Sequence, residues 1–198
     1  HAAELFHRRA RACFVFFVVQ SIHRDHVVEG GVGIWNRAIL PEAELGFIGK
    51  SSKVLDEIPE GVEVSLETMT KPEEAKDFVD QTHVDMFAPA VGNIHGMVKG
   101  GDPKLNIERI KEIKDAVKIP LVLHGGSGNT DEEFKNAIAA GISIIHINTE
   151  IRLAYKQGLQ KYLSENPEEI APYKYLRPAR DEMQLVIEKR IPIFNNLV

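Results

Sequence analysis

The sequence predicts an α/β fold built on a parallel sheet. From residue 42 onward, short apolar runs rich in Val, Ile and Leu alternate with longer segments whose apolar residues recur at helical spacing. Strands that alternate with helices form parallel sheets with right-handed crossovers. A chain of 198 residues with 43% hydrophobic content is long enough to bury one core, so we expect residues 42–198 to fold together.

The predicted strands share a short apolar run followed by a glycine or a polar residue. In chain order they are Glu42–Leu45, Val62–Leu66, Val84–Val91, Ile119–Leu123 and Ile142–Ile147. The predicted helices begin at Pro72 and Thr130 and span Ile107–Val117, Thr149–Leu163 and Pro178–Ile191. Proline suits the first turn of a helix, where its missing N–H costs nothing. Thr130 with Glu133 forms a capping box, and Gly141 ends that helix.

Residues 1–41 do not follow this rhythm, and we treat them as an atypical N-terminal segment. They contain a basic stretch and one strand candidate, Cys13–Val19. This apolar run is far shorter than the ~20 residues that span a bilayer. Polar residues follow it where a signal-peptide cleavage site needs small ones, so we expect neither a membrane segment nor a signal peptide.

Charge and cysteine content narrow the classes of function. The net charge of −5 argues against a nucleic-acid partner, which would favour a basic face. Cys13 is the one cysteine of the chain, so there is no internal disulfide framework. A reducing compartment fits this composition, and we expect a cytoplasmic protein.

Two histidines follow apolar strand-like runs and precede glycine. His95 lies in G-N-I-H-G-M-V-K-G, and His124 lies in P-L-V-L-H-G-G-S-G. The gap between them is one βα unit, so they should come from neighbouring strands and share the carboxyl edge of the sheet. Imidazole suits zinc, and the pair predicts a shared metal site. The alternative is that each is a hydrogen-bonded loop histidine.

Acidic and glycine-rich segments add further candidates. Glu42 and Glu44 lie on one side of a predicted strand, and Glu44 is the better placed as a metal ligand. The turn Gly125-Gly126-Ser127-Gly128 and the run His146-Ile147-Asn148-Thr149 each precede a helix, where backbone N–H groups favour a phosphate. Lys99 supplies a cation for it. The alternatives are solvent-facing carboxylates, an ordinary tight turn and a solvated lysine.

The motifs E-A-E-L-G, G-N-I-H-G-M-V-K-G, P-L-V-L-H-G-G-S-G and I-N-T-E-I-R resemble the class II, zinc-dependent ketose-bisphosphate aldolases over about residues 42–197. The resemblance implies a TIM (β/α)8 barrel. It also implies reversible cleavage of fructose or tagatose 1,6-bisphosphate to dihydroxyacetone phosphate and glyceraldehyde 3-phosphate. Zinc would stabilise the negative charge left on the ketone half.

Site residues follow from this resemblance. His95 and His124 match two of three zinc ligands, and Glu44 matches a glutamate that holds the metal in an alternate position. The residues that match dihydroxyacetone-phosphate contacts are Gly96, Gly125, Gly126, Ser127, His146, Ile147, Asn148 and Thr149. Many members of the family carry asparagine at the position of His146.

The catalytic aspartate and third zinc histidine of the family lie in an H-x-D-H motif after an early barrel strand. Asp25 and His26 stand in such a motif here, after Cys13–Val19. The stretch from His26 to Pro41 is too short for the βαβα that the family places there, and a full barrel takes about 250 residues. The alternative for Asp25 and His26 is a charged surface segment.

We therefore expect an incomplete barrel, the C-terminal half to two-thirds, joined to an atypical N-terminus. Two functions remain open: zinc-dependent aldol cleavage, or an impaired remnant that binds zinc or phosphosugar or only folds by association. The motifs do not separate fructose from tagatose bisphosphate. Open strand edges in an incomplete barrel favour a homo-oligomer.

Overall fold

The computed structural model describes residues 15–16, 40–51, 53–58 and 64–195, and its centre is one five-stranded sheet. The strand order is β1-β2-β4-β6-β7. The four strands that pair in parallel are β2 (Glu42–Leu45), β4 (Met86–Pro89), β6 (Leu121–Leu123) and β7 (Ile142–Ile145). Consecutive parallel strands joined by helices are the architecture expected of part of a TIM barrel.

The edge strand β1 (Val15–Phe16) pairs antiparallel to β2. Two residues of the strand candidate Cys13–Val19 thus lie in a strand, but barrel strands all run parallel, so these two do not pair as a barrel strand does. The other residues of that run lie outside the described part of the chain.

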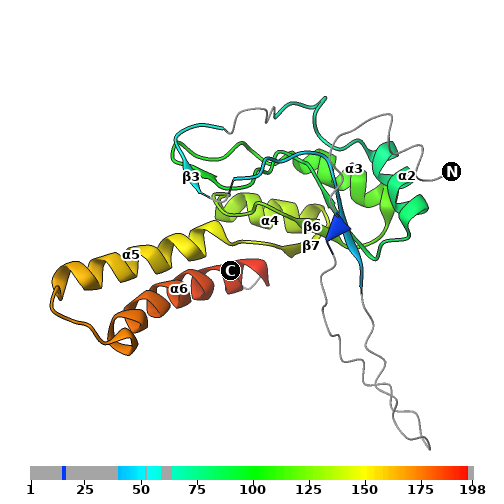
Figure 1. Cartoon of the computed structure of the whole chain (residues 1–198). Coiled ribbons are helices and arrows are strands. Elements are labelled where there is room, and N and C mark those ends of the chain that lie inside the picture. The colour runs from blue at the N-terminus through cyan, green and yellow to red at the C-terminus, as the bar shows by residue number, and fades with distance from the viewer. Residues whose placement is uncertain (1–14, 17–39, 52, 59–63, 196–198) are drawn as a thin grey trace, which may run out of the picture.

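Five helices accompany the sheet in the described residues. They are α2 (Pro72–Thr82), α3 (Ile107–Val117), α4 (Asp131–Ala140), α5 (Thr149–Glu165) and α6 (Pro172–Phe194). Figure 1 shows α5 and α6 side by side as a hairpin that extends from the sheet. The capping box of Thr130 and Glu133 forms as predicted, and Gly141 ends α4 with a φ of 121°.

Two predictions from local sequence are wrong. The last helix begins at Pro172, not at Pro178, which lies inside it. The helix continues through Pro178 where α5 packs closely: a Cβ on Gly158 would lie 3.0 Å from the carbonyl oxygen of Pro178. Within the predicted strand Val62–Leu66, residues 64–66 form no strand and the others lie outside the described residues.

The structure also contains a small parallel pair of strands that the sequence did not predict. It is formed by β3 (Val54–Leu55) and β5 (Met97–Val98).

The two faces of the sheet pack differently because side chains alternate along a strand. One face meets the helices, where Phe87, Leu121 and Leu123 are fully buried with Phe134 of α4. The other face carries a smaller apolar cluster, formed by Met86, Ala88 and Val122 with Leu40 and Ile144. Glu42 and Glu44 alternate with Ala43, so both point to this second face.

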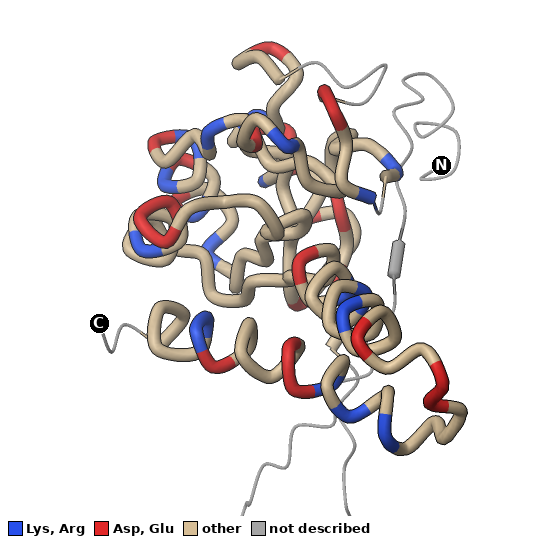
Figure 2. Tube along the Cα trace, turned by 90° about the vertical axis from the view of Figure 1, so that its left-hand side faces the viewer, with Lys and Arg blue, Asp and Glu red and all other residues tan. Residues whose placement is uncertain are grey.

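Charge is spread over the helices. Figure 2 shows Lys and Arg interleaved with Asp and Glu along the α5–α6 hairpin. Among the described residues, no helix is both long and apolar enough to cross a membrane.

Arg190 of α6 is a charged residue with only 8% of its surface exposed. Its guanidinium donates to both carboxylate oxygens of Glu150, at 3.1 and 2.7 Å, and to Asp131 at 2.6 Å. It also lies 4.9 Å from the ring centroid of Phe134. These contacts join the first turns of α4 and α5 to the end of α6.

We expect Arg190→Ala to lower the free energy of unfolding by about 3 kcal/mol, because it leaves the carboxylate of Glu150 buried without this partner. Arg180→Ala is the matched control, since Arg180 pairs with Asp181 on the exposed surface and such pairs contribute ~0–1 kcal/mol. Urea denaturation of both variants measures the difference. If both variants lost the same free energy of unfolding, the contacts of Arg190 would contribute no more than those of an ordinary surface ion pair.

Candidate functional site

The imidazole of His124 lies between two carboxylates at the carboxyl end of β6. Its Nε2 is 2.6 Å from Oε1 of Glu42, and its Nδ1 is 2.7 Å from Oε1 of Glu44. Glu42 is almost fully buried, at 2% exposure, while the side chains of His124 and Glu44 are 13% and 17% exposed. A buried carboxylate is costly unless it is paired, so Glu42 depends on this imidazole.

Both carboxylates lie on β2, which is separated from β6 by β4. Ala88 of β4 stands opposite Glu44 in the register. His124 therefore contacts Glu42 and Glu44 across an intervening strand.

The site shifts several pKa values. Burial disfavours charge on His124, but hydrogen bonds and charge from Glu42 and Glu44 raise its pKa from 6.5 to about 9. Burial opposes ionisation of Glu44, but the adjacent His124 holds the pKa of Glu44 below its ordinary value. In the metal-free form His124 is therefore an imidazolium held between two carboxylates at neutral pH.

Two further histidines flank His124. The ring centroid of His146 lies 4.7 Å from that of His124, and the centroid of His95 lies 6.3 Å away. Burial, together with the charge of His124, lowers the pKa of both flanking histidines. Both are therefore neutral at pH 7 and have a nitrogen lone pair for a metal ion.

These side chains form two overlapping sets that could hold a metal ion. One set is Glu44, His95 and His124, and the other is Glu42, His124 and His146. In each set the potential ligand atoms lie within 4.8 Å of one another. Two imidazoles and one carboxylate are a ligand set of catalytic zinc sites, with the fourth position open. The residues present therefore fit a divalent metal.

Backbone geometry brings the histidine segments together. Gly125 has a φ of 62°, and a Cβ there would lie 2.1 Å from the carbonyl oxygen of Ile94. Only glycine allows such an approach, and it places His124 beside the segment that carries His95. The side chain of Asn93 donates to the carbonyl oxygen of His124 at 2.9 Å, and the N–H of His95 donates to Ile48 at 2.7 Å.

Ser127 joins the glycine turn to the start of α5. Its Oγ accepts from the N–H groups of Asn148, at 3.0 Å, and Glu150, at 3.3 Å. With both lone pairs engaged, the hydroxyl hydrogen is left to donate. The turn is also tied to the next strand end, since the N–H of Gly126 donates to the carbonyl oxygen of His146 at 3.1 Å.

The two helix starts beside this turn differ as anion sites. The start of α4 is closed by the capping box of Thr130 and Glu133 and has three acidic residues in its first turn. Asn148, the N-cap residue of α5, makes no side-chain cap hydrogen bond, although Oγ of Ser127 accepts from the N–H of Glu150 in the first turn. The helix dipole attracts anions, but acidic side chains repel them. Because the first turn of α5 has one acidic residue against three in α4, α5 is the better site for a phosphate.

Other sequence candidates are placed less centrally. Lys99 is exposed and pairs with Asp56 at 2.6 Å. Gly96 has a φ of 107° and lies directly after His95, with its α-carbon packed against the segment at Lys53. Asp25 and His26 lie outside the described residues.

Sequence reasoning underrated two residues. Glu42 contacts His124 as closely as Glu44 does, although the pattern favoured Glu44. Asn93 is 3% exposed and donates to the backbone of His124, and its signal in the sequence was a polar residue two positions before His95 in a buried segment. Neither role is visible without knowing which strands lie side by side.

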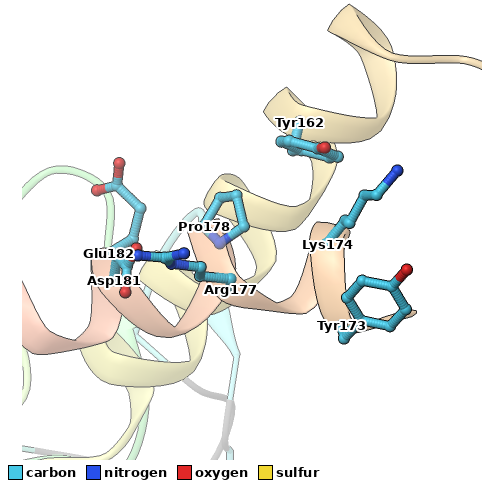
Figure 3. Close-up of a pocket in the computed structure, with 7 residues that line it drawn as sticks. All are labelled: Tyr162, Tyr173, Lys174, Arg177, Pro178, Asp181 and Glu182. Carbon is cyan, nitrogen blue, oxygen red and sulfur yellow. The ribbon is translucent and has the colours of Figure 1, made fainter. Parts of the chain in front are cut away.

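A separate pocket of about 600 Å³ lies in the α5–α6 hairpin. Figure 3 shows its lining, with Tyr162 on α5 and the other labelled residues on α6. Tyr162 is about 20 Å along α5 from Asn148, by the helical rise per residue. Its lining contains no histidine.

The chain is similar in sequence to known fructose-bisphosphate aldolases. The family model described as fructose-bisphosphate aldolase class-II matches residues 35–197. A fructose-bisphosphate aldolase from Geobacillus stearothermophilus is 36% identical over 151 residues, which are 76% of this chain and 50% of that protein. The chain thus spans about half the length of the curated relative it matches.

Solved structures of aldolases also match most of this chain and about half of their own length. The YdjI aldolase from Escherichia coli K12 is 33% identical with a TM-score of 0.59, over 79% of this chain and 49% of that one. A fructose-bisphosphate aldolase from Campylobacter jejuni is 24% identical with a TM-score of 0.57, over 78% and 51%. At 24% identity, the similarity to the Campylobacter jejuni structure shows the fold alone.

The raised pKa of His124 predicts a stability that depends on pH in metal-free protein. The folded state binds the proton more tightly than the unfolded chain, so this contribution is complete below about pH 6.5 and is lost as the pH rises to about 9. Between those limits we expect the free energy of unfolding in EDTA to fall by on the order of 2 kcal/mol more in the wild type than in His124→Gln. Parallel pH profiles for the two proteins would contradict this.

Proposed function

This chain belongs to the class-II fructose-bisphosphate aldolase family, and we propose that its described residues form the metal and phosphate part of an aldolase site. The proposed reaction is the reversible cleavage of fructose or tagatose 1,6-bisphosphate to dihydroxyacetone phosphate and glyceraldehyde 3-phosphate. The observation that carries the proposal is the contact of His124 with Glu42 and Glu44, between His95 and His146 and beside the turn of Ser127.

Zinc is the metal that we propose for this site, held by His95, His124 and Glu44, with His26 as a further ligand. When bound, a divalent ion supplies Lewis-acid stabilisation of the negative charge that carbon–carbon cleavage leaves on the ketone half. The chain's own groups bind and orient that half, so that the bond that breaks lies beside the histidine cluster. Asp25 is the group that we propose to exchange a proton with the reacting hydroxyl.

The phosphate is proposed to lie against Ser127 and the start of α5. The hydroxyl of Ser127, which has a hydrogen to donate, and the start of α5, with one acidic residue in its first turn against three in α4, support this position. Gly125 and Gly126 let the turn approach without side chains in the way, and Gly96, His146, Ile147, Asn148 and Thr149 complete the proposed contacts. Lys99 would need to leave Asp56 to reach a phosphate, and both side chains are exposed enough to move.

A second candidate function is an impaired site that binds metal or phosphosugar without efficient turnover. It is favoured by the short stretch from His26 to Pro41, which leaves no room for the βαβα of the family. Without a placed carboxylate, the proton step loses on the order of 10²–10⁴-fold.

We also propose that copies of this chain associate, in the cytoplasm. Strand β7 is an edge strand of the described sheet, and an edge presents unpaired backbone groups. Several apolar side chains of α6 are exposed, including Leu185 and Ile191. An open strand edge and exposed apolar surface both favour self-association.

Metal binding should be lost in His124→Ala, because both metal-binding sets include His124. Changes in outer-shell partners typically cost about 10–100-fold in affinity, so loss of the shared ligand should cost more. Zinc content after equilibrium dialysis measures this. The matched control is His83→Asn, since His83 is exposed at the end of α2 with a φ of 55° that asparagine tolerates. Equal zinc in both variants would contradict the proposed site.

Ser127→Ala should weaken binding of dihydroxyacetone phosphate by roughly 1.5–3 kcal/mol, because it removes a hydrogen bond to a charged group. Calorimetric titration measures the affinity. Ser143→Ala is the control, since Ser143 is an exposed residue of β7. An unchanged affinity in Ser127→Ala would place the phosphate elsewhere.

Cleavage of fructose and tagatose bisphosphates by this chain should be slow compared with the Geobacillus relative measured beside it. The reason is that the stretch between His26 and Glu42 is shorter than in the family. This affects the placement of His26, the proposed zinc ligand, and of Asp25, the proposed proton-transfer group, and both act on the same transition state. A coupled assay with added zinc measures turnover. Robust, chelator-sensitive turnover that disappears in Asp25→Ala would overturn this expectation and favour the first function over the second.

A further inference from the structure

We propose that Glu42, His124 and His146 form a second position for a divalent metal ion, on the opposite edge of the His124 ring from Glu44 and His95. The inference rests on the proposed function only in that both positions share His124. It assigns Glu42 and His146 a role as metal ligands. His146 is the residue at which this chain departs from the asparagine of many family members.

The geometry gives each position its own carboxylate. Glu42 faces Nε2 of His124, and Glu44 faces Nδ1, so an ion bound through one nitrogen lies on the opposite side of the ring from an ion bound through the other. The ligand atoms of Glu42, His124 and His146 all lie within 4.8 Å of one another. Ligands of one tetrahedral zinc lie about 3.4 Å apart, so small side-chain rotations bring these three atoms onto one ion.

An alternative role for Glu42 is to orient His124. Metal-bound histidines commonly donate their second ring N–H to a carboxylate, and Glu42 would do this for an ion bound at the Glu44 side. An orienting carboxylate does not need another imidazole. The ring of His146 nevertheless lies closer to His124 than that of His95 does, 4.7 against 6.3 Å between centroids. This second imidazole favours a ligand set over an orienting pair.

The ligand set also defines the class of ion. Two imidazoles and one carboxylate suit Zn²⁺, Co²⁺ or Ni²⁺, whereas Mg²⁺ and Ca²⁺ prefer oxygen ligands. A neutral imidazole offers one lone pair, so the two positions exclude each other and one ion is bound at a time. Glu42 is more buried than Glu44, at 2% against 17%, so the second position is the deeper one.

The test is a titration with Co²⁺, which reports ligand geometry through its visible absorption spectrum. His95→Ala removes one ligand of the first position, and His146→Asn removes one of the second. We expect each single variant to bind one Co²⁺ with a spectrum distinct from that of the other. The double variant should bind more than about 100-fold more weakly than either.

A matched pair of carboxylate variants sharpens the result. In the His95→Ala background, Glu42→Gln should abolish tight binding, whereas Glu44→Gln should leave it unchanged. Circular dichroism melts establish that each variant is folded. If His95→Ala binds as weakly as the double variant, or if Glu44→Gln and Glu42→Gln act alike in its background, the second position is overturned and Glu42 is an orienting residue. In that outcome tight binding by His146→Asn still supports the proposed function, which fails instead if the wild type and His146→Asn bind no metal.

Discussion

The site of this protein depends on one largely buried imidazole that contacts two carboxylates. Glu42 and Glu44 are brought to the same face of β2 by strand alternation, and Glu42 is almost completely buried there. Burying a carboxylate costs free energy unless a cation or a metal compensates it. His124 provides that compensation from the end of β6, across the intervening strand β4. The other histidines, the glycine turn and the proposed phosphate-binding segment lie around His124.

The proposed phosphate site and the helix hairpin are linked by a short series of contacts. The Oγ of Ser127 accepts from the N–H of Glu150, and the carboxylate of Glu150 accepts from Arg190 at the end of α6. Arg190 also binds Asp131 in the first turn of α4. The same arginine therefore fixes the starts of both helices that follow the two site strands. This gives α6 a role in the geometry of the site although it contributes no side chain to it.

Those parts of the fold that depend on residues close together in the sequence could be predicted. Helix Ile107–Val117 and the capping box at Thr130 depend on spacing and on residues three positions apart, and both form as predicted. The start of α6 was misplaced because proline rules describe an isolated helix, whereas close packing against Gly158 carries this one through Pro178. The pair of β3 and β5 joins short segments far apart in the sequence, and neither segment has a strong pattern of its own.

The candidate site also has a part that local sequence predicts and a part that only the structure shows. His95 and His124 could be found because each stands between a strand-like run and a glycine. The importance of Glu42 could not be found in this way, because it depends on which ring nitrogen faces which carboxylate across an intervening strand. Similarly, the sequence showed two possible helix starts for a phosphate. The capping box and three acidic residues at the start of α4, against one acidic residue at the start of α5, distinguish them once the structure is known.

The most direct test of this account is the protonation of His124 in metal-free protein, followed by nitrogen-15 NMR of the imidazole rings as the pH is raised. If two carboxylates hold this ring, both of its nitrogens carry protons at pH 7.5, its pKa is about 9, and zinc displaces a proton from it. A His124 ring that is neutral at pH 7.5 and titrates near its ordinary value of 6.5 would contradict the central claim. The contacts with Glu42 and Glu44 would then not be what organises the site.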